Sequence, residues 1–277
     1  MRYENYIAHS VPNKYAFSHN RTQGWTFDSH VHTCHEIIYV IEGDFSYTIE
    51  GYEYILSPGD MIITSPYELH SFIFPENSVY ERQFLHIYPE FVNDFSYIFS
   101  EISKYKLGTY NYIPAALVSK YGLHSYMQNI EDYCKGPHEN VDIMTLTCSL
   151  QLIVKISEML KIENITHSKA QENKTVEQIK AYVDKNFKLP LTLDQIAQSV
   201  YLNKSYVCRL FKQKTGITLK TYMNMKRIIY AKNKIFNGES PSAIYSSCGF
   251  NDYTTFYRSF MKYVSMPPNE FKASLMK

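Results

Sequence analysis

Residues 196–212, IAQSVYLNKSYVCRLFK, decide the fold of the C-terminal part of this chain, because their pattern returns in residues 244–262, IYSSCGFNDYTTFYRSFMK. Each copy reads as a short helix, a tight turn and a second helix, and Ala197 supplies the small residue that lets the first pair of helices cross closely. The repeated positions are Ile196, Leu202, Arg209 and Phe211, echoed by Ile244, Phe250, Arg258 and Phe260. The repeat predicts two helix-turn-helix motifs, in which the second helix projects its N-terminal half into the major groove of DNA.

Helix start and stop signals surround both copies. A long helix over 217–236 is expected to join them, with Gly238 as its stop. Asn203 is placed to cap the second helix of the first copy, and Gly216 is placed to end it. The spacing of a capping box, which marks a helix start, occurs in Thr175 with Gln178 and in Thr192 with Gln195. The whole region is therefore expected to be helical.

Charge is divided unevenly along the chain, although its net charge is only +1. Residues 174–277 hold 17 basic and 6 acidic side chains, a net charge of +11, and the rest of the chain has a net charge of −10. A compact basic domain is typical of nucleic-acid binding. A Lys-rich helical surface that only meets solvent would have the same composition, so charge alone leaves both interpretations open.

The double motif resembles the C-terminal half of the AraC/XylS family of transcription regulators, in order over residues 196–271. The matching residues are Ile196-Ala197, Leu202-Asn203, Arg209 to Lys212, Gly216, Tyr222, Arg227 and Ala231 in the first half, and Ile244, Gly249 to Asp252, Phe256, Arg258, Phe260, Lys262, Pro268 and Phe271 in the second. The resemblance implies that two recognition helices, held by the long helix, enter successive major grooves on one face of the DNA. Tyr245 stands where the family has a small residue, so the second turn is expected to be splayed or differently packed.

The resemblance also implies which side chains meet DNA. Arg209 and Arg258 are each able to read a guanine through two hydrogen bonds, or alternatively to hold a phosphate or a helix end. The residues expected at base edges are Ser205, Cys208 and Arg209 in the first half and Tyr253, Thr254 and Arg258 in the second. Lys204, Lys212, Lys214 and Lys262 are expected phosphate contacts, and Asn203 completes the expected DNA-binding set.

The first 88 residues read as short strands and turns, because Tyr, Phe, Ile and Val alternate with polar residues between interrupting glycines and prolines. The spacing of Gly24, His30, His32, Glu36 and Gly43 resembles the first motif of the cupin superfamily, and Gly59-Asp60, Pro66 and His70 resemble part of the second. The resemblance implies a double-stranded β-helix barrel with His30, His32, Glu36 and His70 near its mouth. Strand alternation predicts His30, His32 and Glu36 on one face, and an exposed His35 on the other.

Three interpretations of this histidine cluster stay open. Three histidines and a carboxylate suit a divalent transition metal, the barrels of AraC-type regulators bind organic effectors, and histidines can also be purely structural. The leading prediction is an effector pocket of His30, His32, Glu36, His70 and Tyr39, with no metal and no cofactor assigned. The aromatic side chains that suit a sugar ring or an apolar ligand are Trp25, Phe27, Tyr39, Tyr47, Tyr54 and Phe72.

A helical segment and a linker separate the two ends of the chain. Residues 141–160 carry apolar side chains at helical spacing over a wide face, which predicts a helix that packs on its own barrel or forms a homodimer interface. Residues 163–175, ENITHSKAQENKT, are polar and read as a linker. The predicted fold is an α+β multidomain chain with a cupin-like barrel over 1–88, a helical dimerisation segment over 89–162, the linker over 163–175 and an all-α double helix-turn-helix over 176–277.

Composition bounds the compartment and the function. The cysteines, Cys34, Cys134, Cys148, Cys208 and Cys248, are scattered, which fits free thiols in a reducing cytoplasm. Neither a secretory signal nor an uninterrupted apolar run of about 18 residues is expected. The leading prediction is a cytoplasmic, non-enzymatic homodimer that binds double-stranded DNA and a small-molecule effector such as a sugar, and no membrane. The alternatives are a metal-dependent cupin enzyme with a DNA-targeting module, and a DNA-binding protein whose barrel takes no ligand.

Overall fold

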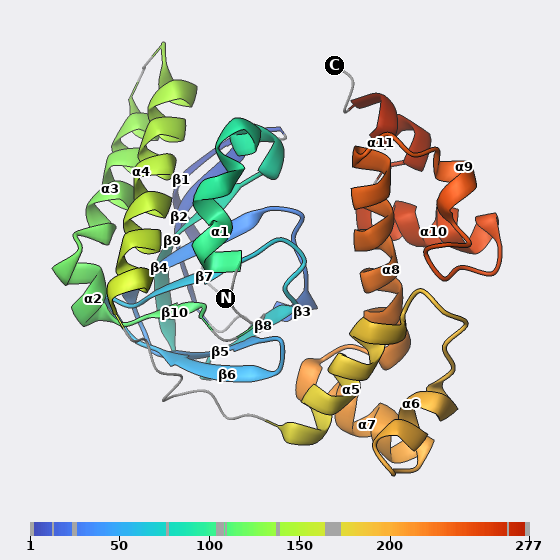
Figure 1. Ribbon diagram of the computed structural model, residues 1–277. Helices are drawn as coiled ribbons and strands as arrows, with labels where there is room; N and C mark the ends of the chain where they lie inside the picture. The colour runs from blue at the N-terminus through green and yellow to red at the C-terminus, as the bar shows by residue number, and fades with distance from the viewer. Residues whose placement is uncertain are drawn as a thin grey trace. The chain divides into compact units, whose positions relative to one another are not determined.

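The computed structural model describes residues 3–12, 14–23, 27–75, 78–103, 108, 110–136, 139–163, 173–264 and 266–274. The chain divides into two compact units, residues 1–171 and residues 172–277 (Figure 1). The first unit is built on β-strands and helices, and the elements of the second are all helices. Gly24, Trp25 and most of the predicted linker lie outside the described residues.

Two antiparallel sheets face each other in the first unit. The larger runs in the order β1-β2-β9-β4-β7-β10 and the smaller in the order β3-β8-β5-β6. Ile38 and Val40 of the larger sheet share a buried cluster with Tyr47 and Phe72 of the smaller sheet, so this cluster fills the space between them. The predicted double-stranded β-helix barrel is thus present as two facing antiparallel sheets, which the described strands do not close into a barrel. The strands are β1 Tyr3–Val11, β2 Tyr15–Gln23, β3 Phe27–His30, β4 His35–Glu42, β5 Phe45–Ile49, β6 Tyr52–Leu56, β7 Met61–Thr64, β8 His70–Ile73, β9 Val79–Ile87 and β10 Tyr112–Ile113.

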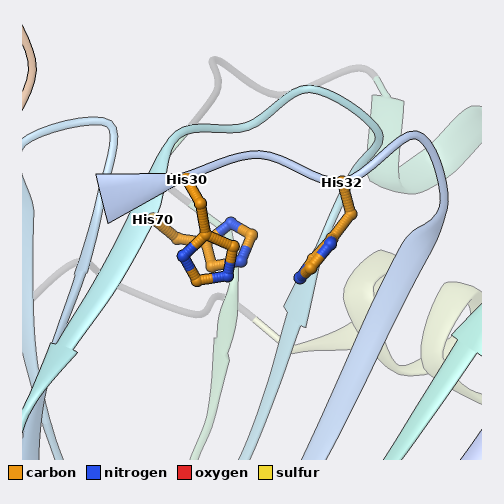
Figure 2. Close-up of side chains that lie close together, drawn as sticks. All are labelled: His30, His32 and His70. Atoms are coloured by element: carbon orange, nitrogen blue, oxygen red, sulfur yellow. The ribbon is translucent and has the colours of Figure 1, made fainter. Parts of the chain in front are cut away.

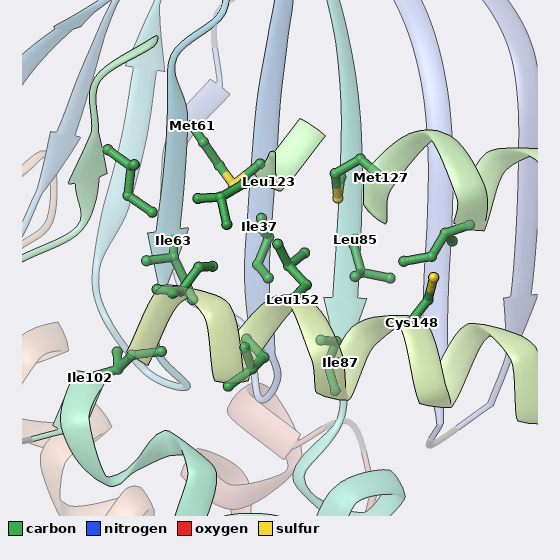
Figure 3. Packing of buried hydrophobic residues seen from close by; sticks show 14 of the residues in the cluster. Ile37, Met61, Ile63, Leu85, Ile87, Ile102, Leu123, Met127, Cys148 and Leu152 are labelled. Carbon is green, nitrogen blue, oxygen red and sulfur yellow. The ribbon is translucent and has the colours of Figure 1, made fainter. Parts of the chain in front are cut away.

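The larger sheet buries both of its faces. On β4, Ile38 packs toward the smaller sheet, whereas Ile37 packs toward the helices. Figure 3 shows Ile37, Leu85 and Ile87 of this sheet close to Leu152 of the covering helix α4. A strand buried on both faces carries a nearly continuous apolar run, which is why residues 37–41, IIYVI, do not alternate with polar residues.

Helices cover the outer face of the larger sheet, and they are η1 Pro89–Phe99, α1 Ser100–Ser103, α2 Ala115–Lys120, α3 Leu123–Lys135 and α4 Val141–Ile162. Most of the apolar face of α4 packs in this core, with Leu152, Ile153 and Ile156 fully buried. Ile143 and Val154 remain exposed on its outer side. By length and composition α4 could cross a membrane, but half of its most apolar window is buried inside the unit, and the core helix of a globular domain passes the same test.

The second unit consists of α5 Lys174–Asn186, α6 Leu193–Ser199, α7 Lys204–Thr215, α8 Leu219–Phe236, α9 Pro241–Ile244, α10 Tyr253–Val264 and α11 Pro268–Ser274. In Figure 1 the long helix α8 runs from the α6–α7 pair to the α9–α10 pair. The two pairs have separate cores, one around Phe211 and one around Phe256 and Phe260, and α8 contributes to both through Tyr222 and Ile228. The double helix-turn-helix architecture predicted from the repeat is therefore present.

Side-chain caps set several of these helix ends. The capping box of Thr192 and Gln195 is formed, with both reciprocal hydrogen bonds in place. Asn203 caps α7, since its side chain accepts a hydrogen bond from the backbone N–H of Tyr206 at 2.8 Å. Gly216 ends α7 in the left-handed region, at φ 77°. These three predictions are confirmed.

Two predicted helix starts are wrong. The cap of α5 is Asn173 rather than Thr175, because the Asn173 side chain accepts a hydrogen bond from the backbone N–H of Val176. The end of the predicted linker thus already belongs to a helix. The long helix begins at Leu219 rather than Ile217, since Thr218 caps it. In each case a competing polar side chain close by captures the free backbone N–H groups of the first turn.

The two tight turns are closed by the same backbone hydrogen bond. Leu202 N–H donates to the carbonyl of Ala197, and Phe250 N–H donates to the carbonyl of Tyr245, each at 3.1 Å. The Tyr245 ring is half-buried and packs edge-on against Tyr253, with centroids 6.0 Å apart. The large residue therefore changes the packing beside the second turn without opening it.

Candidate effector site and DNA-binding surface

Four elements bring the histidine cluster together in the first unit. His30 ends β3 and His70 begins β8, and the two residues are paired across the smaller sheet. Glu36 lies on β4 of the larger sheet, paired with His86 on β9. His32 lies in the segment between β3 and β4. Figure 2 shows the rings of His30, His32 and His70 turned toward one another.

The predicted strand that would hold His30, His32 and Glu36 on one face is not present. The chain leaves β3 at His30 and enters β4 only at His35. The rings still converge, since the His30 and His32 centroids lie 4.8 Å apart and the His32 and His70 centroids 5.1 Å apart. His35 does lie on the opposite face from Glu36, but its predicted exposure is wrong, because it is buried and stacks on Phe99 at 4.0 Å between centroids.

Glu36 is a buried carboxylate held by two donors. His86 Nε2 lies 2.9 Å from Oε1, and the Tyr47 hydroxyl donates to Oε2 at 3.0 Å. Burial opposes ionisation of Glu36, but the hydrogen bond from His86 and the nearby His70 outweigh it and hold the pKa of this carboxyl well below its usual range. A fixed negative charge therefore sits at the centre of the cluster.

His70 and His32 face this carboxylate as neutral rings. Burial lowers the pKa of His70 to about 4 and that of His32 to about 3, although the nearby negative charge of Glu36 raises the pKa of both rings. The carbonyl of Glu68 lies 2.8 Å from His70 Nδ1, so Nδ1 carries the ring proton of the neutral form. His70 Nε2 is then an electron-pair donor, buried and without a hydrogen bond, 3.5 Å from Glu36 Oε2.

These groups fit a transition-metal ion by the chemistry of their donors. His30, His32 and His70 each offer a ring nitrogen within 4.8 Å of the others, and a second group of His32, Cys34 and His86 meets the same limit. Zn²⁺ and its neighbours in the first transition row prefer imidazole nitrogen, with carboxylate oxygen as a common fourth ligand. The nitrogen of His70 that lacks a hydrogen bond is the observation that supports this fit.

Sequence reasoning missed one member of the cluster, assigned another only part of its role and misplaced a third residue. His86 lies outside both cupin-like motifs, and its only signal is its alternation with Phe84 along β9. Tyr47 was expected as an aromatic wall, whereas its hydroxyl also holds Glu36. Tyr39 lies on the other face of β4, packed with the helices and stacked near His124, so it is apart from the cluster. Phe72 lies beside His30, at 6.2 Å between ring centroids, as expected.

In the second unit, α7 presents most of its expected DNA-binding residues to solvent. Ser205, Arg209 and Lys212 are exposed, and Cys208 is half-buried. The Arg209 guanidinium lies 5.7 Å from the ring of Tyr206, an exposed aromatic that sequence reasoning did not single out. Lys204 forms an ion pair with Asp194 at 3.0 Å, and Lys214 is exposed.

On α10 the exposed side chains form a stripe at helical spacing. Thr254, Arg258 and Lys262 are exposed, as expected for residues that meet DNA. Tyr257 is exposed between them, and the spacing of the stripe is the signal that could have identified it. Tyr253 is half-buried and packs on Tyr245 and Phe256, so much of its ring serves the core of the second helix pair.

Two family models match the chain. A model described as "AraC-like ligand binding domain" matches residues 15–104, which include the histidine cluster. A model described as "Helix-turn-helix domain" matches residues 196–274, from α6 to α11. The two matches fall on separate compact units.

Curated relatives match over different lengths. The transcriptional activator RhaS of Enterobacter sp. (strain 638) is 23% identical over 251 residues, which are 89% of this chain and 87% of RhaS. The Msm operon regulatory protein of Streptococcus mutans is 23% identical over 155 residues, and the match spans just over half of that protein, 56%. Among solved structures, ToxT of Vibrio cholerae is 13% identical, with 95% of this chain and 100% of that chain covered and a TM-score of 0.39.

Proposed function

Because this chain belongs to the AraC/XylS family of transcription regulators, we propose that α7 and α10 enter successive major grooves on one face of double-stranded DNA. The chain is a DNA-binding regulator whose activity an effector modulates. The observation that carries the assignment of α7 and α10 is the pair of exposed arginines, Arg209 and Arg258, at equivalent positions of the two second helices. Their surroundings support it, since residues 174–277, nearly all of the second unit, have a net charge of +11.

The proposed contacts divide into two kinds. Arg209 and Arg258 read base edges, since a guanidinium matches the two acceptors of guanine. Lys204, Lys212, Lys214 and Lys262 bind phosphates, which position the protein without reading sequence. Ser205, Cys208 and Thr254 lie near the arginines on α7 and α10, and their shorter side chains also contact base edges. Asn203 acts mainly through its cap of α7.

The first unit is proposed to hold the effector at the cluster of His30, His32, Glu36 and His70. A sugar ring that stacks on aromatic side chains is the organic candidate for this site. We also propose that the chain is a homodimer through the exposed face of α4, acts in the cytoplasm and catalyses no reaction. The support for the dimer is the pair of exposed apolar residues, Ile143 and Val154, on the outer side of α4.

Separate substitutions of the arginines test the proposed base reading. Arg209→Ala and Arg258→Ala should each weaken binding to the selected site by about 1–3 kcal/mol and relax base preference at one position. Selection of binding sites from a random DNA pool, followed by affinity measurements on the full chain, gives both quantities. Lys204→Ala is the control and should weaken binding to all sequences about equally. Arginine variants that lose affinity and keep their full sequence preference would show phosphate contacts instead.

A further inference from the structure

We propose that Tyr206 of α7 and Tyr257 of α10 read thymine, each through contact of its ring with the C5-methyl group in the major groove of DNA. This inference rests on the proposed function of α7 and α10 as the helices that enter the grooves, and it names a second base that they recognise. The guanidinium groups of Arg209 and Arg258 match guanine, and a different kind of side chain is needed for the methyl group of thymine.

Large apolar side chains are exposed to solvent on both helices. Tyr206 is 39% exposed, Tyr257 is 38% exposed and Met261 is 36% exposed, and all three lie on α7 or α10. In the described part of the second unit, the other exposed large hydrophobic residues are Leu189, Tyr201 and Phe236. A single exposed tyrosine is ordinary on a protein surface. One tyrosine on each groove helix, close to the arginine, instead places apolar surface where base edges are expected.

On α10 the tyrosine and the arginine belong to one face of the helix. The exposed residues at spacings of three or four are Thr254, Tyr257, Arg258, Met261 and Lys262. Tyr257 is the fifth of the twelve residues of α10, so it lies in the N-terminal half that projects into the groove. The ring of Tyr253 lies 6.3 Å from that of Tyr257 between centroids and limits where the Tyr257 ring can turn. Tyr257 and Arg258 are therefore expected to approach neighbouring base pairs together.

On α7 the tyrosine contacts the arginine itself. The guanidinium carbon of Arg209 lies 5.7 Å from the centroid of the Tyr206 ring, three residues earlier on the helix. A cation–π contact of this kind orders both side chains before DNA binds. The backbone of Tyr206 is fixed as well, since its N–H donates to the side chain of Asn203. The Tyr206 ring is therefore held beside the guanidinium, within reach of the base pair next to the one that Arg209 reads.

The methyl group of thymine is the chemical match for these rings. In the major groove all base pairs present hydrogen-bond donors or acceptors, whereas only thymine adds an apolar group, its C5-methyl. Contact between this methyl group and a ring removes apolar surface of both partners from water. Burial of one such group corresponds to roughly a fourfold change in affinity. A tyrosine hydroxyl can also bind a phosphate, but that contact would not depend on the methyl group, so the two roles can be separated by experiment.

Replacement of single thymines by deoxyuridine tests the inference, because uracil lacks only the methyl group. Sites that the full chain selects from random DNA should carry a thymine beside each guanine whose selection depends on Arg209 or Arg258. Uracil at that position should weaken binding of the wild type roughly fourfold. Tyr206→Ala and Tyr257→Ala should bind the thymine site more weakly than the wild type. Each variant should no longer distinguish thymine from uracil at its own position, yet still do so at the position that the other tyrosine reads.

Two kinds of control separate the ring from other causes. Tyr206→Phe and Tyr257→Phe keep the ring and should keep the fourfold difference between thymine and uracil. Phe236→Ala removes an exposed ring at the end of α8, outside both groove helices, and should also keep it. Equal affinity of the wild type for the thymine and uracil sites would overturn the inference, and so would selected sites without thymine beside the guanines. Both outcomes leave specific DNA binding intact, whereas a wild type that binds all sequences alike would overturn the proposed function.

Discussion

At the scale of single residues, both helix-turn-helix copies place a residue with positive φ in the turn, but the two residues differ. The residue before the apolar end of each turn has positive φ, +57° at Tyr201 and +89° at Gly249. Tyr201 is 96% exposed, so its side chain lies almost wholly in solvent. A Cβ at Gly249 would lie 2.4 Å from the carbonyl oxygen of Phe187. Only the second copy therefore requires glycine for both conformation and space.

Gly249→Ala should lower the free energy of unfolding of the second unit by more than about 2 kcal/mol. The left-handed conformation alone costs an alanine about 1 kcal/mol, and the clash with Phe187 adds to it. Gly238→Ala is the matched control, because Gly238 has φ +91° and no atom within 4 Å of a new Cβ. Urea unfolding followed by circular dichroism measures both, and equal losses in the two variants would contradict the close contact.

His35 makes stability depend on pH. Burial lowers its pKa from 6.5 to about 3, so the unfolded chain binds a proton that the folded chain rejects. The folded state therefore loses stability as pH falls below about 6.5, by up to about 1.4 kcal/mol per pH unit for one such group. The loss ends once the pH is below the pKa of the folded state.

His35→Leu should remove this share of the acid sensitivity. Between pH 6.5 and 5.5 the variant should lose about 1 kcal/mol less unfolding free energy than the wild type, and the apolar side chain should also suit the contact with Phe99. Far-ultraviolet circular dichroism follows the urea transition of both proteins at each pH. His124→Leu serves as the control, and an acid sensitivity unchanged by His35→Leu would refute the argument.

At the scale of elements, sequence patterns predict helices of the second unit better than faces of strands in the first. Short-range caps such as Asn203 and Gly216 act within one turn, so they can be recognised from a few residues. The side on which Tyr39 lies depends instead on which layers cover β4, and a strand buried on both faces carries no alternation to reveal it. His86 joins the cluster through pairing of β4 with β9, which are far apart in sequence and carry no spacing signal.

The outer face of α4 is where a dimer would form. Ile143 and Val154 are 59% and 38% exposed, and most of the other apolar residues of this helix are committed to the core. The double variant Ile143→Lys with Val154→Lys should convert a dimer into a monomer, since each lysine would otherwise bury a charge in the interface. Sedimentation at tens of micromolar checks this, with the exposed Ile73→Lys on β8 as a control that should stay dimeric. A monomeric wild type at that concentration would end the dimer proposal.

At the scale of the whole molecule, the two units differ in charge and so in response to salt. The net charge is −10 for residues 1–173 and +11 for residues 174–277, so an electrostatic attraction to DNA must come from the second. The proposed effector site, in contrast, holds a buried carboxylate and neutral histidines that bulk salt screens little. Salt should therefore separate the two activities.

Affinity of the full chain for DNA should fall steeply with salt. If about six phosphates are neutralised, the slope of log affinity against log salt concentration is near −5, and in any case steeper than −4. Fluorescence anisotropy with a labelled duplex measures the slope, and Lys212→Ala should make it shallower by about 1 unit. A slope near zero would remove the electrostatic basis for DNA binding.

The contact around Gly249 has a consequence for the DNA itself. Arg227 of α8 donates hydrogen bonds to the carbonyls of Phe187 and Leu189, at 2.8 and 3.1 Å, and its guanidinium lies 5.7 Å from the ring of Phe250. The loop after α5, the central helix and the second turn are thus locked at one junction. We therefore expect the second unit to hold α7 and α10 at a fixed spacing rather than to let the two helices move independently. Operators with one base pair inserted between the two contacted segments, a rotation of roughly 35°, would fit only one helix at a time, so spacing is itself part of the recognised sequence.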